Sequence, residues 1–142
     1  MIVGEIYYNP RHYVDQQTGQ FKPKYFLLLA LTSGRDLIVR VLTSRQHGRP
    51  ENPVCSHADP YPAYFLGVPG DPLGQKTGLD LRAHPDIEET ALKKKIGAGA
   101  ITRIAELNRL ILIQAMECAA AAPDTTLQQE RHIRDTIAAL RA

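Results

Sequence analysis

Two apolar runs dominate the hydrophobic pattern of the chain. Tyr25 to Leu31 and Leu37 to Leu42 each have the length of a strand, and turn-forming residues at 32–36 separate them, so the pattern predicts a β-hairpin. The first run has no polar face and is expected to be buried on both sides, whereas Arg40 in the second is expected to point the other way. Both patterns are typical of the central hairpin of a small barrel or sandwich.

Shorter patterns predict the strands on either side of this hairpin. Met1 to Tyr8 is a β-rich run that is expected to end at Asn9-Pro10, because proline cannot donate to a ladder. Residues 11–22 have little apolar content and are expected to form an exposed loop. Tyr64 to Val68 and Leu79 to Leu81 have the pattern of two further short strands.

From residue 100 onwards the hydrophobic period changes from that of a strand to that of a helix. Ile104, Leu107 and Ile111 fall on one helical stripe, which predicts a helix from about Ile101 to Ala122 that packs on the sheet. Pro123 is expected to end this helix.

A second helix is predicted at the C-terminus. Asp124-Thr125-Thr126 followed by Gln128-Gln129 supplies an N-cap and a capping-box pattern. With strands first and helices last, the predicted fold is α+β, mainly β. One domain, 1–142, is expected to hold a small antiparallel β-barrel with its loops (1–99), a packed helix (100–122) and an additional C-terminal helix (124–141). The wide apolar face and the spare helix predict a homodimer.

The composition is that of an ordinary globular protein. The 142 residues are 44% hydrophobic and 23% charged with a net charge of +2, which excludes fibres and is too small a charge to indicate nucleic-acid binding by itself. A signal-peptide pattern and a membrane-spanning run are both lacking, so a cytoplasmic protein is expected. Cys55 and Cys118 lie far apart and are therefore expected to be free thiols.

Local clustering of cations and tyrosines gives the first indication of function. The candidate RNA-binding residues flank the two central strands closely and carry a positive charge, a hydroxyl or an imidazole: Lys24, Ser44, Arg45, His47 and Arg49. Tyr7, Tyr8 and Tyr13 add the aromatic side chains that suit unstacked bases. Cutting RNA without a metal requires a base, an acid and fixed cations. Asp80 or a histidine can serve as base, and Thr43 can donate a hydrogen bond to a phosphate oxygen.

A metal site is the weaker interpretation of a second cluster. Cys55, His57 and Asp59 alternate, so an extended segment would project all three potential zinc ligands the same way. Zinc sites usually add a second ligand pair from elsewhere, and His47 and His84 do not have that spacing. No metal and no cofactor are therefore expected.

Several short motifs, taken in order, resemble the PemK/MazF family of toxin endoribonucleases. Those proteins read G-[DE]-[IV] near the start, R-P before an aliphatic strand, and I-T-S or V-T-S at the end of the next strand. The matching segments here are Gly4-Glu5-Ile6, Lys22-Pro23 and Val41-Leu42-Thr43-Ser44. Lys76 to Arg82 and the basic run Lys94-Lys95-Ile96-Gly97 follow in the family's order, so the resemblance covers roughly residues 1–115.

The resemblance implies an SH3-like barrel that works as a homodimer, cleaves single-stranded RNA without metal and is neutralised by an antitoxin protein. It also implies catalytic roles for Lys22, Thr43 and His12, and for Asp80 and Arg82 as an acid-x-base pair in the reverse of the family's order. Lys22 stands where the family has arginine, and a lysine cannot grip a phosphate with a two-pronged fork. Three classes therefore remain open: a metal-independent endoribonuclease, a catalytically silent barrel that binds a protein or nucleic acid, and a metal-dependent hydrolase.

Overall fold

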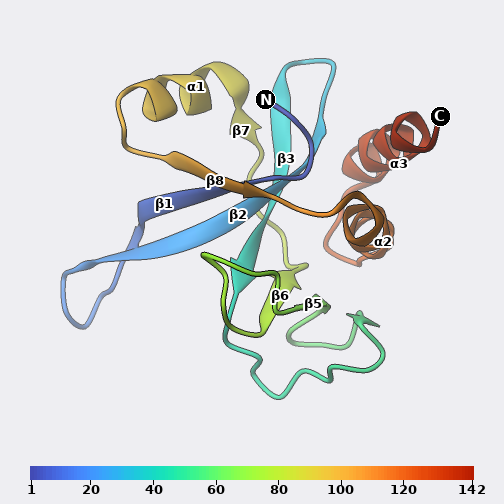
Figure 1. The fold of residues 1–142 in the computed structure, drawn as a ribbon, viewed down its shortest axis with the longest axis horizontal. Helices are drawn as coiled ribbons and strands as arrows, with labels where there is room; N and C mark the ends of the chain where they lie inside the picture. The colour runs from blue at the N-terminus through green and yellow to red at the C-terminus, as the bar shows by residue number, and fades with distance from the viewer.

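The computed structural model describes all 142 residues and shows one curled antiparallel sheet with three helices (Figure 1). The predicted class, α+β and mainly β, is confirmed. In chain order the elements are β1 (Glu5–Val14), β2 (Phe21–Leu31), β3 (Asp36–Thr43), β4 (Cys55–Ser56), β5 (Ala63–Gly67), β6 (Thr77–Asp80), β7 (Ile87–Glu88), α1 (Glu89–Gly97), β8 (Thr102–Glu106), α2 (Arg109–Ala120) and α3 (Leu127–Arg141).

The strand order is β4-β5-β6-β3-β2-β1-β8, with β7 paired to the start of β3. This order has two ends, so the strands form an open sheet and do not close into the small β-barrel that the sequence predicted. The short strands predicted around Tyr64 and Leu79 are present as β5 and β6. Helices α2 and α3 lie together on one side of the sheet, and α1 lies apart from them (Figure 1).

The central hairpin forms as predicted, from β2 and β3. Leu27 and Leu29 face the main core with α2 and α3, whereas Phe26 and Leu28 face a second core with Leu92 of α1. Because both faces of β2 are covered, its sequence has no polar face.

Arg40 on β3 departs from the expectation of a polar face. It is fully buried, and its guanidinium donates to the Val39 carbonyl (2.8 Å) and to Oε1 of Gln129 in α3 (3.3 Å). The turn that leads into α3 covers this position, so an arginine that reads as surface in the sequence lies in the interior.

The first strand is longer than predicted. β1 continues through Asn9-Pro10 to Val14, and its pairing with β2 shifts register between Asn9 and Tyr13. This irregularity accommodates the proline inside a strand. The expected loop 11–22 is thereby reduced to residues 15–20, and β1 and β2 form a long hairpin that projects from the sheet (Figure 1).

Gly4 and Glu5 of the first family-like motif have structural roles. Gly4 has a φ of +96°, and a Cβ there would lie 2.7 Å from Cδ2 of Leu112 in α2, so only glycine fits. Glu5 is 6% exposed, accepts from Tyr7 Oη (2.8 Å) and forms an ion pair with Arg103 of β8. Gly4 and Glu5 therefore fix the start of β1 against α2 and β8.

The helix predicted from Ile101 to Ala122 is wrong in its first third. Ile104 lies in β8, which pairs with β1, and Leu107 follows that strand as a buried connector. The helix begins only after Asn108, whose side chain accepts from the backbone N–H of Leu110 (3.0 Å) as an N-cap. The lysine-rich run Lys93-Lys94-Lys95, earlier in the chain, forms an exposed side of α1.

The C-terminal helix is confirmed with its cap. Thr126 Oγ1 accepts from the Gln129 N–H (3.0 Å) and Gln129 Oε1 accepts from the Thr126 N–H (3.1 Å), which completes the capping box. None of the three helices combines the length and the hydropathy that crossing a membrane requires.

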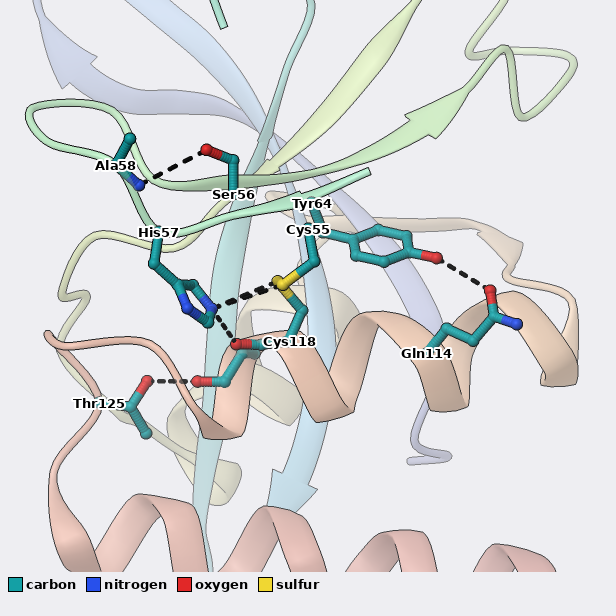
Figure 2. The surroundings of a disulfide bond; sticks show 9 residues. Cys55, Ser56, His57, Ala58, Tyr64, Gln114, Cys118 and Thr125 are labelled. Carbon is teal, nitrogen blue, oxygen red and sulfur yellow. Dashed lines mark hydrogen bonds between the residues drawn. A yellow bond between two sulfur atoms is a disulfide. The ribbon is translucent and has the colours of Figure 1, made fainter. Parts of the chain in front are cut away.

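The prediction that Cys55 and Cys118 are free thiols is wrong. The two cysteines form a disulfide that joins β4 to α2, across a sequence separation of 63 (Figure 2). The sheet edge brings together two residues that the sequence gives no reason to pair.

Candidate nucleic-acid interface

Two adjoining cavities lie beside the projecting hairpin, at the ends of β3 and β6. Their volumes are about 390 and 480 Å³, and they share Tyr13 and Lys24. All five predicted catalytic residues line one or the other: Lys22 and Thr43 the first, and His12, Asp80 and Arg82 the second. Of the predicted RNA-binding residues, Lys24, Ser44 and Arg45 line these cavities, but His47 and Arg49 do not.

Thr43 is the last residue of β3, where it pairs with Gly78 of β6. Its side chain is largely buried, and its Oγ1 accepts a hydrogen bond from the Arg45 N–H (3.1 Å). Because a hydroxyl both accepts and donates, its own proton remains for a group in the cavity. The same bond fixes the start of the loop that carries Arg45.

Asp80 and Arg82 form a close pair. The strand β6 ends at Asp80, so Arg82 lies beyond it and turns back, donating to Oδ2 of Asp80 through Nη2 (2.6 Å) and Nε (3.1 Å). Burial raises the pKa of Asp80, but the hydrogen bonds from the Arg82 side chain and backbone outweigh it and leave that pKa below its usual value. Asp80 is therefore a fixed carboxylate that anchors Arg82 and makes a poor base.

His12 is the better base. It is half-buried, and burial, followed by the charges of His84 and Lys24, lowers its pKa below the usual value of a histidine. Its imidazole is therefore neutral at neutral pH and can take a proton.

His84 stacks on His12 with ring centroids 5.6 Å apart. Its Nδ1 lies 2.8 Å from the Pro85 carbonyl, which can only accept, so Nδ1 carries a proton and Nε2 remains available to a ligand in the cavity. No sequence pattern indicated His84 apart from its position two residues after Arg82, because its partner His12 lies far away in the sequence, in β1.

The cations here differ in how far they are neutralised. Lys22 lies 3.9 Å from Asp15, whereas no ion pair of the structure includes Lys24 or Arg45. Burial and then the charge of Arg45 lower the pKa of Lys24. Two cations close to each other without a carboxylate partner favour an anionic ligand between them.

Tyr61, which no sequence pattern indicated, organises the neighbouring surface. The His47 ring stacks on it with centroids 4.4 Å apart, and the guanidinium carbons of Arg49 and Arg82 lie 5.1 and 5.2 Å from its ring centroid. Arg49 Nε also donates to the Tyr61 carbonyl (2.9 Å). His47 and Arg49 therefore contact Tyr61 and help to position it beside Arg82. They are not cations left free for a ligand in the cavities.

The tyrosines expected to bind bases have different environments. Tyr7 is buried in the second core, so it is not accessible to a base. Tyr8 stacks against Tyr25 with centroids 5.0 Å apart, and only Tyr13 lines both cavities with its side chain partly exposed.

Comparisons with protein-family models, with curated proteins and with solved structures gave no match for this chain.

Proposed function

We propose that the protein is a metal-independent endoribonuclease of the PemK/MazF type, which cleaves single-stranded RNA by attack of the 2′-hydroxyl. One observation carries the proposal: three segments far apart in the sequence, around Lys22, Thr43 and Asp80, line two adjoining cavities that also hold a histidine of lowered pKa and unneutralised cations. A surface that only binds RNA needs the cations but not the neutral imidazole.

Each group has a role in that reaction. His12 takes the proton of the 2′-hydroxyl, whose oxygen attacks phosphorus as the bond to the 5′-oxygen breaks. Lys24, Arg45 and the Thr43 hydroxyl stabilise the charge on the non-bridging oxygens, and a water molecule protonates the departing 5′-oxygen. The Asp80–Arg82 pair binds the adjacent phosphate, because Arg82 keeps a half-exposed guanidinium beside the second cavity.

A catalytically silent RNA-binding protein is the second candidate. Lys22, at the family's arginine position, is partly exposed and paired with Asp15, and Asp80 is already taken by Arg82. If catalysis depended on these two residues alone, the site would bind RNA without cutting it. The two candidates therefore differ in whether His12 performs proton transfer.

The proposal includes a homodimer and an antitoxin protein as partners. Exposed apolar side chains on the projecting hairpin support a protein interface there: Tyr13 is 46%, Val14 42% and Phe21 51% exposed. The protein acts in the cytoplasm in this proposal, since its RNA substrate and its antitoxin are there. Light scattering should give about twice the chain mass of 15.8 kDa, and Phe21→Asp should lower it. A monomer at high concentration would remove the dimer from the proposal.

The decisive experiment is cleavage of a long single-stranded RNA by the purified protein in EDTA. Products should carry 2′,3′-cyclic phosphate or 3′-phosphate ends, because the 2′-hydroxyl is the nucleophile. DNA of the same sequence should bind without being cut, and expression in cells should arrest growth. RNA that is bound but left intact would select the silent protein, and cleavage that requires a divalent ion would select a metal-dependent hydrolase.

A further inference from the structure

A cluster of soft metal ligands surrounds the disulfide, on the edge of the sheet where β4 meets α2. Cys55 comes from β4, Cys118 from α2 and His57 from the segment just after β4. Figure 2 shows the His57 ring directed at the two sulfurs, with its Nε2 3.5 Å from each Sγ and 3.0 Å from the Cys118 carbonyl oxygen. Asp59, the third residue of the alternating sequence pattern, is not part of the cluster.

The imidazole already lies where a zinc ligand would. Zn–S and Zn–N bonds of about 2.3 and 2.0–2.1 Å at a tetrahedral angle separate a sulfur and a nitrogen ligand by about 3.5 Å. Both distances from His57 Nε2 to sulfur have this value. Once the disulfide is reduced, the sulfurs have only to separate to about 3.8 Å, the edge of the same tetrahedron.

We propose that the reduced protein binds one Zn²⁺ through Cys55, Cys118 and His57, with water as fourth ligand. This inference is independent of the ribonuclease activity. Two electrons and two protons from a thiol or phosphine reductant convert the disulfide into two thiols, and zinc binding then releases the two thiol protons to solvent. Two sulfurs and an imidazole select zinc over magnesium or calcium, which prefer oxygen ligands.

The proton on His57 has to move for this to happen. The contact with the Cys118 carbonyl requires Nε2 to carry the proton in the disulfide form, since a carbonyl only accepts. Zinc takes the lone pair of Nε2, so the proton transfers through solvent to Nδ1, for which the structure gives no competing partner. His57 and Cys55 are only partly buried, which leaves the ion and its water a route to the site.

The zinc would preserve the same cross-link that the disulfide makes. In either form β4 is tied to α2, and with it the segment 48–62 that carries Tyr61. β4 and α2 would therefore stay cross-linked both under oxidising conditions, through the disulfide, and under reducing conditions, through zinc.

The test measures bound zinc by elemental analysis after anaerobic reduction with a phosphine, removal of the reductant, and dialysis against ZnCl₂. Reduced wild type should hold one equivalent and give thiolate-to-metal absorption with Co²⁺, whereas the oxidised protein should hold none. Cys118→Ser and His57→Gln should each weaken zinc binding at least tenfold. Asp59→Asn and His132→Ala are matched controls that should bind like wild type.

A second readout is thermal unfolding of the reduced protein, since a metal that binds only the folded state raises the melting temperature. Zinc should raise it for reduced wild type and for Asp59→Asn, but not for His57→Gln. Absence of stoichiometric zinc in reduced wild type, or equal zinc in His57→Gln, would overturn the proposal.

Discussion

The helix-covered side of the sheet and the cavity side use polar residues in opposite ways. Under α2 and α3, most polar groups bond to one another: Arg40 Nη2 donates to Gln129, although Arg40 Nε has no partner, and Tyr64 Oη donates to Gln114 Oε1 (3.0 Å). Around the cavities, no ion pair includes Lys24 or Arg45, and the lowered pKa of His12 keeps it neutral at neutral pH. Buried polar groups that are satisfied internally contribute specificity and stability, whereas unsatisfied cations in a cavity leave interactions for a ligand.

This contrast predicts a separation of effects. Substitutions at the cavities should change RNA cleavage and leave stability nearly unchanged, and substitutions on the helix-covered side should do the reverse.

His12→Ala should have the largest effect on cleavage. Loss of the general base should reduce kcat/KM by about 10²–10⁴-fold, with RNA affinity within a few fold of wild type, because the imidazole acts mainly in the transition state. Single-turnover cleavage and filter binding measure the two quantities. His132→Ala on α3 is the matched control and should cleave normally. Equal cleavage by His12→Ala and wild type would exclude His12 as the base.

Cys118→Ser tests the helix-covered side. The disulfide closes a loop of 63-residue separation, so its loss from the oxidised protein should cost about 4 kcal/mol of unfolding free energy by the chain-entropy estimate. Urea unfolding in EDTA measures this change. The fraction that stays folded should cleave RNA at the wild-type rate, and a large loss of specific activity in folded Cys118→Ser would contradict the proposed separation.

Thr43→Val should raise the activation barrier to cleavage by about 2–4 kcal/mol, because its hydroxyl donates to the phosphate oxygen on which charge develops. Valine keeps the shape of threonine, so the melting temperature should change little. Thr102→Val on β8 is an exposed control of the same chemistry. If Thr43→Val cleaves at the wild-type rate, the cations alone stabilise the charge on the phosphate oxygens and Thr43 has no catalytic role.

Features encoded within a few residues were predictable. The central hairpin followed from two apolar runs and a turn, and α3 followed from the capping box of Thr126 and Gln129. In both cases the determining contacts are local in the sequence, so the pattern contains them.

Features that depend on distant partners were not predictable. Ile104 fits a helical stripe by spacing, but pairing of β8 with β1 and the Arg103–Glu5 ion pair make it a strand residue. Burial of Arg40 likewise depends on α3, which lies 85 or more residues further along the chain. The disulfide between Cys55 and Cys118 depends on the contact between the edge strand β4 and the helix α2. The Asn108 N-cap was the one local signal for the true helix start.

The candidate site shows the same division. Thr43 and Lys24 were found because they lie next to a strand that the sequence predicts. His84 and Tyr61 were not connected with the site, because they reach it only through stacking on His12 and on His47, residues of other segments.

The pH dependence of cleavage gives the smallest but most specific test of the cavity side. His12 must be neutral to accept a proton, and its pKa is lowered, so kcat/KM should rise with pH through a midpoint below 6.5, the ordinary histidine value. Lys24 must be protonated to bind phosphate, and its pKa is also lowered, so activity should fall again at a midpoint below 10.5.

Lys24→Arg separates the two limbs of this profile. Arginine stays protonated throughout, so the alkaline limb should move upward while the acid limb stays in place. Lys76→Arg is the matched control, because Lys76 is already paired with Glu51 and lines neither cavity. It should leave both limbs unchanged. An acid limb at or above 6.5, or an alkaline limb that does not move in Lys24→Arg, would mean that other groups control the reaction. Because burial and neighbouring positive charge lower both pKa values, the two midpoints report directly on the environment that distinguishes this side of the sheet from the other.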